Sequence, residues 1–175
     1  MVLFDCDFLC FLIHENPGVV LNPATRKPVE NAKRKVEHLI GILSARREKI
    51  IVPTPALSEI LCLAGNGAHK VLDALTSTYR FELAAFDVMA AVEAAIATAH
   101  AKAKHDKKGG SRSTWAKVKF DRQIIAIAKA RGVNVIYSND KDIHRFAAQE
   151  GMKVIAVWDL PDLPPEQDLL PGVDD

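Results

Sequence analysis

The sequence predicts an α/β fold, a three-layer α/β/α sandwich around a short and mainly parallel central sheet. Short apolar runs alternate along the chain with longer segments that carry the three-and-four spacing of amphipathic helices. Strands separated by helices are typical of a parallel sheet covered on both faces. With 175 residues, 49% of them hydrophobic, the chain has the size and composition of one globular domain.

The individual elements follow from local patterns. The expected strands are apolar or alternating runs at Val2–Phe4, Ile50–Val52, 79–85, Val133–Tyr137 and Lys153–Trp158. The expected helices have apolar residues at helical spacing, over 29–43, 54–64, about 68–77, from Asp87 onward, up to Arg131, and from about Asp140 to Glu150. Thr54 and Pro55 supply an N-cap and a first-turn proline, and Gly132 ends the helix before it.

The stretch Lys102–Lys119 interrupts this pattern. It contains seven basic residues, one acidic residue and the sequence Gly109-Gly110-Ser111, so we expect a mobile loop or a frayed helix end. Its candidates for contact with RNA are Lys104, Lys107, Lys108, Arg112 and Trp115. The tryptophan either stacks on a base or packs the loop against the domain.

Charge is distributed unevenly. The net charge is +1, but the chain from Asp159 onward carries six acidic residues and no basic one, so residues 1–158 carry +7. A basic body favours a polyanionic partner, of which nucleic acid is the commonest. We therefore expect a domain over residues 1–158 and an extended, acidic, proline-containing tail over 159–175.

The sequence also indicates a cytoplasmic protein without a membrane partner. No apolar run approaches the ~20 residues of a membrane-spanning helix. Asp5 and Asp7 interrupt the first apolar segment, which makes it a poor signal peptide. The three cysteines include no Cys-x-x-Cys pair, so neither a disulfide framework nor a thiolate zinc site is expected.

Four carboxylates stand where apolar or neutral residues are expected. Asp5 and Asp140 each follow a strand, and the carboxyl ends of parallel strands meet at the edge where ligands bind. Glu59 lies on or beside the apolar face of its helix. Asp121 falls within the apolar stripe of the helix that ends at Arg131, where a charge is costly without compensation.

Taken singly, each acid has an ordinary explanation as a cap, a solvated residue or half of an ion pair. Taken together, four carboxylates at one edge repel one another, and a divalent cation that prefers oxygen ligands removes the conflict. The pattern therefore indicates Mg²⁺ or Mn²⁺, which serves phosphoryl chemistry by activating water and stabilising a leaving oxygen.

The chain resembles PIN-domain ribonucleases, in particular the VapC-type toxins of bacterial toxin–antitoxin pairs. The matching segments are VLFDCDFLCFLI, IIVPTPALSEIL and FDRQIIAIAKARGVNVIYSNDKDI. The resemblance implies that the catalytic and metal-binding acids are Asp5, Glu59, Asp121 and Asp140. Asp142 takes the place of an additional acid found in many members, and Ser138 and Asn139 match small polar residues near the site.

The function implied by this resemblance is metal-dependent endoribonuclease activity, with RNA as the substrate. A toxin of this type would pair with an antitoxin whose segment covers the acidic cleft, and would form a homodimer through apolar helices. Asp7 departs from the family pattern, which commonly has Asn, Ser or Thr at this position, and the basic stretch at 102–119 is longer than in compact toxins.

Two other functions are weighed against this one. Asp5-Cys6-Asp7 after a strand also resembles the start of a haloacid-dehalogenase-type phosphatase, with Asp5 as the nucleophile and Asp7 as the general acid. That family prefers Thr or Val at the position of Leu9 and gives Glu59 no role. The other alternative is a non-catalytic module that binds RNA or a protein and tolerates the loss of Asp5.

Overall fold

The core of the molecule is a five-stranded, entirely parallel sheet. The structure is a computed structural model that describes residues 1–14 and 17–163. The strands are β1 (Val2–Phe4), β2 (Ile50–Pro53), β3 (Phe81–Ala84), β4 (Val135–Tyr137) and β5 (Lys153–Ile155). They lie in the order β3-β2-β1-β4-β5, and every neighbouring pair is parallel.

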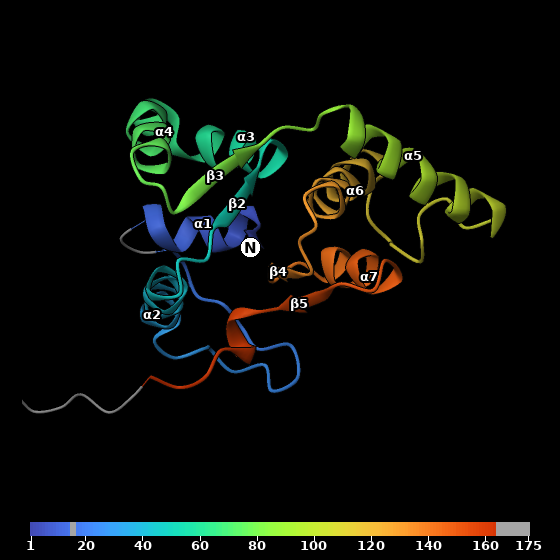
Figure 1. The fold of residues 1–175 in the computed structure, drawn as a ribbon. Helices are drawn as coiled ribbons and strands as arrows, with labels where there is room; N and C mark the ends of the chain where they lie inside the picture. The colour runs from blue at the N-terminus through green and yellow to red at the C-terminus, as the bar shows by residue number, and fades with distance from the viewer. Residues whose placement is uncertain (15–16, 164–175) are drawn as a thin grey trace, which may run out of the picture.

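Helices cover both faces of the sheet, which confirms the predicted three-layer α/β/α sandwich. The α-helices are α1 (Cys6–Ile13), α2 (Ala32–Ala45), α3 (Thr54–Ala64), α4 (Ala68–Thr76), α5 (Val88–Ala103), α6 (Trp115–Ala130) and α7 (Lys141–Gln149). Two short 3₁₀ helices are η1 (Gly65–Gly67) and η2 (Val157–Asp159). Figure 1 shows α1 to α4 on one side of the sheet and α5 to α7 on the other.

The two-residue period of the strands divides the apolar side chains between two cores. In β1, Val2 and Phe4 pack with α1 to α4, whereas Leu3 packs with α5, α6 and α7. The same alternation holds in β2, where Ile51 joins the second core. Because both faces are covered, the three central strands β1, β2 and β4 are apolar throughout. The outer strands β3 and β5 each carry one charged residue, Glu82 and Lys153.

The strand order reverses at β1. From β1 the chain proceeds to β2 and β3 on one side, and then returns to place β4 and β5 on the other. The carboxyl ends of β1 and β4 therefore flank a topological switch point, where open α/β sheets bind ligands. Asp5 directly follows β1, and Asp140 follows β4 after two residues.

Three details of the predicted secondary structure were wrong. The strand expected over Lys153–Trp158 ends at Ile155, and Val157–Asp159 forms the 3₁₀ helix η2. The sequence pattern did not predict α1, because its apolar composition leaves no polar face from which a helical period can be read. The basic loop is shorter than Lys102–Lys119: α5 continues to Ala103, and α6 begins at Trp115. Thr114 caps α6 by accepting a hydrogen bond from Lys117 N (3.3 Å).

None of the helices among the described residues is long and apolar enough to cross a membrane. The acidic tail falls mostly on residues 164–175, which lie outside the described part of the chain. Its first residues do contact the domain. Leu160 is 7% exposed and belongs to the core beside α2, and Asp162 pairs with Lys35 (2.7 Å).

The tail boundary at residue 158 stays a prediction, and two truncations test it. A chain that ends at residue 163 is expected to melt at the temperature of the full chain. A chain that ends at Trp158 is expected to melt cooperatively but several degrees lower, because it lacks Leu160, whose burial is worth about 1.5–3 kcal/mol. Calorimetry measures both transitions. A non-cooperative transition in either chain would mean that the tail is part of the domain.

Candidate active site

Asp5 joins the ends of β1 and β4. It caps α1, where its Oδ1 accepts a hydrogen bond from Cys6 N (2.7 Å), and its Oδ2 accepts one from Ser138 Oγ (2.8 Å). Its side chain is buried, and this burial raises the pKa of the carboxyl to about 6, with Glu59 and Asp140 adding to the rise. Asp5 is therefore held in place by one backbone and one side-chain donor.

Asp140 is fixed by the start of α7. Its Oδ1 accepts hydrogen bonds from Asp142 N (2.6 Å) and Ile143 N (3.4 Å), so it is the N-cap of that helix. Ser138 Oγ, which donates to Asp5, also accepts from Asp140 N (3.0 Å). One hydroxyl thus connects the two acids that follow neighbouring strands.

Asp121 reaches the same place from α6, on the opposite side of the sheet from α1. Its carboxylate is almost fully buried and receives Lys117 Nζ at 2.8 Å on one oxygen and 2.9 Å on the other. The same ammonium lies 2.9 Å from Asp140 Oδ2. Burial raises the pKa of Asp121 to about 6 although Lys117 acts in the opposite direction.

Lys117 is the central cation of this arrangement, and the sequence reasoning missed it. Burial acts to lower the pKa of its ammonium, but the hydrogen bonds to Asp121 and Asp140 outweigh burial and raise it. The available signal was the four-residue spacing from Asp121, which places both side chains on one helical face. In the sequence, Lys117 falls within the stretch Lys102–Lys119, for which we expect a mobile loop or a frayed helix end.

Glu59 completes the group from α3. Burial raises the pKa of its carboxyl above the ordinary value, and the charges of Asp121 and Asp140 add to the rise. Together the four predicted acids line one cleft of about 500 Å³. Its lining residues are Asp5, Cys6, Asp7, Cys10, Glu59, Leu63, Lys117, Asp121, Ile124, Asn139 and Asp140. The structure thus brings together acids that are up to 135 positions apart in the sequence.

Asp7, considered only as a phosphatase general acid, lies at the rim of this cleft. Asn139 N donates to its Oδ2 (2.5 Å), while its Oδ1 is buried and has no hydrogen-bond partner. Burial and the nearby charge of Asp5 raise the pKa of Asp7 well above its ordinary value. A protonated Asp7 would carry no charge into the crowded cleft. The amide of Asn139 also accepts from Val157 N (2.9 Å) and so ties the site to η2.

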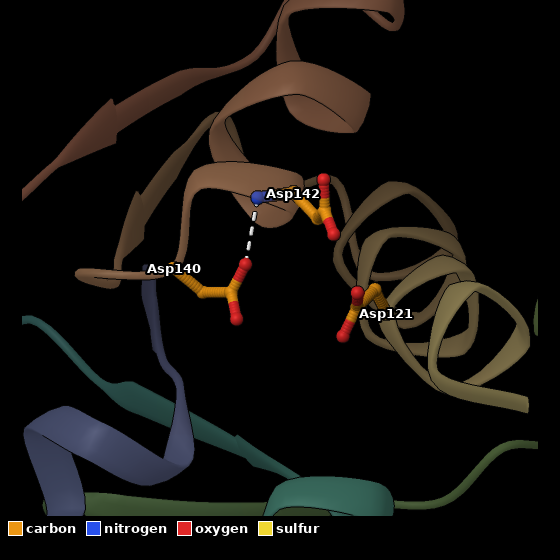
Figure 2. Close-up of side chains that lie close together, drawn as sticks. All are labelled: Asp121, Asp140 and Asp142. Carbon is orange, nitrogen blue, oxygen red and sulfur yellow. Dashed lines mark hydrogen bonds between the residues drawn. The ribbon is translucent and has the colours of Figure 1, made fainter. Parts of the chain in front are cut away.

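Asp142 has a different environment from the other acids. One oxygen each of Asp121, Asp140 and Asp142 lie within 4.8 Å of one another (Figure 2). Both oxygens of Asp142 accept hydrogen bonds: Oδ2 accepts from Ser111 Oγ (2.8 Å) and Ser113 Oγ (2.6 Å), and Oδ1 accepts from Arg145 Nη1 (2.6 Å). Burial acts to raise its pKa, but the two hydroxyls and Arg145 hold it below the ordinary value.

The basic candidates do not line the acidic cleft. Trp115 faces a separate groove between α5 and α6, with Lys107 Nζ 4.2 Å from its ring centroid. Lys108 Nζ donates to Ser113 O (2.7 Å). Trp115 therefore packs the loop against the domain, and Lys104 and Arg112 remain exposed. Contact between these residues and RNA stays a prediction.

A parallel sheet with an acidic cleft at its carboxyl edge is found here in a chain that matches a known protein family. A family model described as "PIN domain" matches residues 24–149, and the chain belongs to this family. No curated protein sequence matches the chain.

Three solved structures share the fold at low sequence identity. VapBC2 from Rickettsia felis, bound to a promoter DNA fragment, is 13% identical to this chain and superposes with a TM-score of 0.60. The match covers 89% of this chain and 98% of the chain in that structure. DNA-bound VapBC from Salmonella typhimurium is 17% identical, with a TM-score of 0.58 and coverage of 89% and 97%. Mycobacterium tuberculosis VapC20, a sarcin-ricin loop cleaving toxin, is 14% identical, with a TM-score of 0.52 and coverage of 85% and 95%.

The raised pKa values of Asp5 and Asp121 predict how the stability of the metal-free protein depends on pH. The folded state keeps these protons up to about pH 6, whereas the unfolded chain loses them near pH 4. The free energy of unfolding therefore falls as pH rises through this window. The free energy of unfolding of Asp121→Asn is expected to fall less over the same range. Thermal melts of both proteins between pH 4 and pH 8 measure the difference. Identical pH profiles would contradict the raised pKa of Asp121.

The position of Lys117 predicts that it competes with a divalent cation. In Lys117→Met no ammonium lies between Asp121 and Asp140, so Mn²⁺ is expected to bind at least tenfold more tightly. Calorimetric titration with Mn²⁺ measures the affinity, and Lys119→Met, an exposed lysine on the same helix, is the matched control. Weaker binding to Lys117→Met would show that the lysine supports the cation.

Proposed function

We propose that the protein is a Mg²⁺- or Mn²⁺-dependent endoribonuclease that hydrolyses phosphodiester bonds in RNA. The observation that carries the proposal is the convergence of Asp5, Glu59, Asp121 and Asp140 on one cleft, around a single ammonium. Carboxylates in this number repel one another without a cation. Membership of the PIN domain family supports the same function.

The side chains present fit a divalent cation of the oxygen-preferring kind. Lys117 Nζ, which bridges Asp121 and Asp140, marks a place where positive charge is already stabilised. We assign Asp5, Asp121 and Asp140 as ligands, directly or through water, and Glu59 as a further ligand or as the group that orients the attacking water. When bound, such an ion lowers the pKa of water and stabilises charge on the phosphate oxygens.

The other residues of the site hold these acids in position. The Ser138 hydroxyl and the first turn of α7 orient Asp5 and Asp140, so their oxygens face the cleft without further rearrangement. Water attacks phosphorus, the bond from phosphorus to the leaving oxygen breaks, and no side-chain nucleophile is required. Lys117, which lines the same cleft, would be available to pair with a phosphate oxygen.

We assign Asp142 to positioning rather than to direct coordination. Its Oδ2 accepts hydrogen bonds from both Ser111 and Ser113, and its Oδ1 pairs with Arg145. It therefore has less capacity left for an ion than Asp5, whose oxygens each accept one hydrogen bond. Through the hydrogen bonds to the two serines, Asp142 fastens the segment between α5 and α6 to the start of α7. It remains an additional candidate ligand because its oxygens lie near those of Asp121 and Asp140.

We further propose that the enzyme is the toxin of a type II toxin–antitoxin pair. Support comes from the similarity of its fold to VapBC complexes and to VapC20, a toxin that cleaves the sarcin-ricin loop. A cognate antitoxin would cover the acidic cleft. The exposed apolar side chains of Met89, Val92 and Ile96 on α5 are suited to a homodimer contact.

The alternatives remain testable. A phosphatase with Asp5 as nucleophile leaves Glu59 and Asp121 without a role. Recovery of a phosphorylated Asp5 after incubation with a phosphate ester would favour that reading. A non-catalytic RNA- or protein-binding module would need none of the acids for its activity.

The proposed function predicts that Asp121→Asn abolishes RNA cleavage and leaves a folded protein. Asparagine keeps the size of the side chain but removes the charge that the cation requires, so a loss of at least 100-fold in rate is expected. Cleavage of single-stranded RNA with Mn²⁺ is measured alongside a thermal melt. Asp73→Asn, an exposed aspartate on α4, is the control. Undiminished cleavage by Asp121→Asn would show that this site does not catalyse the reaction.

A further inference from the structure

A groove of about 420 Å³ runs between α5 and α6, away from the acidic cleft. Three cations line it, namely Lys102, Lys119 and Arg122, and none of the described residues that line it is acidic. Trp115, Lys119 and Arg122 recur at helical spacing and so share one face of α6. The groove has no lining residue in common with the acidic cleft, so the proposed ribonuclease mechanism makes no use of it.

Arg122 is a buried cation that forms no ion pair within the part of the chain that the structure describes. It is only 5% exposed, and its Nη1 donates to the neutral hydroxyl of Thr98 at 3.4 Å. Its guanidinium lies over two aromatic rings, 5.7 Å from the centroid of Trp115 and 5.4 Å from that of Phe146. Burial lowers the pKa of this guanidinium, although Asp106 acts in the opposite direction. Because a guanidinium donates several hydrogen bonds, Arg122 keeps capacity for an anionic ligand.

The rest of the groove is apolar, which narrows the kind of anion that fits it. Small side chains of α5 and two aromatic rings line it, namely Ala94, Ala95, Ala99, Phe86 and Trp115. A nucleobase needs a free aromatic face for stacking, but Lys107 and Arg122 both lie over the ring of Trp115. The groove therefore favours an acidic peptide with apolar side chains over a strand of nucleic acid.

The chain itself contains a segment of this composition. Residues 164–175, which lie outside the described residues, have the sequence PPEQDLLPGVDD. The segment carries four acidic residues, no basic residue, and the apolar residues Leu169, Leu170 and Val173. Residues 1–158 carry a net charge of +7, so the charges of the tail and of the groove are complementary.

The place where the described chain ends favours the groove of another molecule. The last described residues follow the pair between Asp162 and Lys35 on α2 (2.7 Å). Figure 1 shows α2 on the opposite side of the sheet from α5 and α6. The tail spans at most about 40 Å when fully extended, and it would have to pass around its own sheet to reach its own groove. A groove on a second copy requires no such path.

We propose that the groove between α5 and α6 binds the acidic tail, residues 164–175, of a second copy of this chain. Carboxylates of the tail pair with Lys102, Lys119 and Arg122, and its leucines cover the alanines of α5. The contact links copies of the chain and does not depend on the proposed ribonuclease function, which uses another face of α6.

Binding of a synthetic tail peptide to the full-length protein tests this proposal. In the protein, the acids of the tail are replaced by their amides so that its own tail does not compete: E166Q, D168N, D174N and D175N. The anisotropy of a fluorescein-labelled peptide of residues 164–175 is expected to rise saturably as this neutral-tail chain is added. A peptide with serine in place of Leu169 and Leu170 keeps every charge and is expected to bind about tenfold more weakly. Absence of saturable binding overturns the proposal.

Two charge reversals locate the binding in the groove. In the neutral-tail chain, Lys102→Glu and Lys119→Glu are each expected to weaken peptide binding about tenfold, because attraction becomes repulsion. Both lysines are exposed, so thermal melts are expected to stay unchanged. Lys70→Glu, at an exposed lysine on α4, is the matched control and should bind the peptide as its parent does. Equal weakening by all three reversals would indicate unspecific attraction and overturn the proposal.

The unmodified chain tests whether the tail comes from a second copy. Diluted below the dissociation constant, it is expected to bind the labelled peptide as tightly as the neutral-tail chain does. Its sedimentation coefficient is expected to rise more with concentration than that of the neutral-tail chain. If the peptide is blocked at every dilution, each tail occupies its own groove and the proposal is overturned. If the peptide does not bind while Lys102→Glu and Lys119→Glu weaken the binding of RNA, the groove contacts RNA and the proposal is equally overturned.

Discussion

The burial of several acids together at the carboxyl edge of the sheet, with their mutual repulsion added to the cost of desolvation, is the constraint on which the site depends. Asp5 and Asp121 are buried within reach of Asp140, and burial raises the pKa of both to about 6. Lys117 relieves part of the conflict by contacting Asp121 and Asp140 at once. Keeping these carboxylates together lowers the stability of the metal-free protein, which is typical of a site arranged for a cation.

The scaffold maintains this unfavourable grouping through fixed hydrogen bonds. Ser138 contacts both Asp5 and Asp140, and the first turn of α7 donates to Asp140. Asp142 performs a parallel task one turn away, where it binds Ser111 and the neighbouring serine of the loop before α6. These donors belong to the sheet edge and to the start of α7, and they hold Asp5 and Asp140 in place, whereas Asp121 is held by Lys117.

Asn139 connects the acidic cleft to the residues that follow β5. Asn139 contacts Asp7 through its backbone N and Val157 of η2 through its side chain. The stacked rings of His144 and Trp158 lie beside the same loop, where His144 Nε2 is hydrogen-bonded to Ser138 O (2.9 Å). Asp7, Asn139 and Asp140 consequently line both the acidic cleft and a hollow next to it.

The sequence by itself determined the α/β class, the positions of the strands, and the four acids of the cleft, because apolar periodicity and the place of a charge within it are local properties. Only the tertiary structure decided that α1 is a helix, that Lys117 pairs with both Asp121 and Asp140, and that Asp142 accepts hydrogen bonds from two serines. Those features depend on contacts between distant segments, such as Ser138 with Asp5 across 133 positions. A local pattern carries no information about such distances, and the pKa values and ion pairs of the site follow from them.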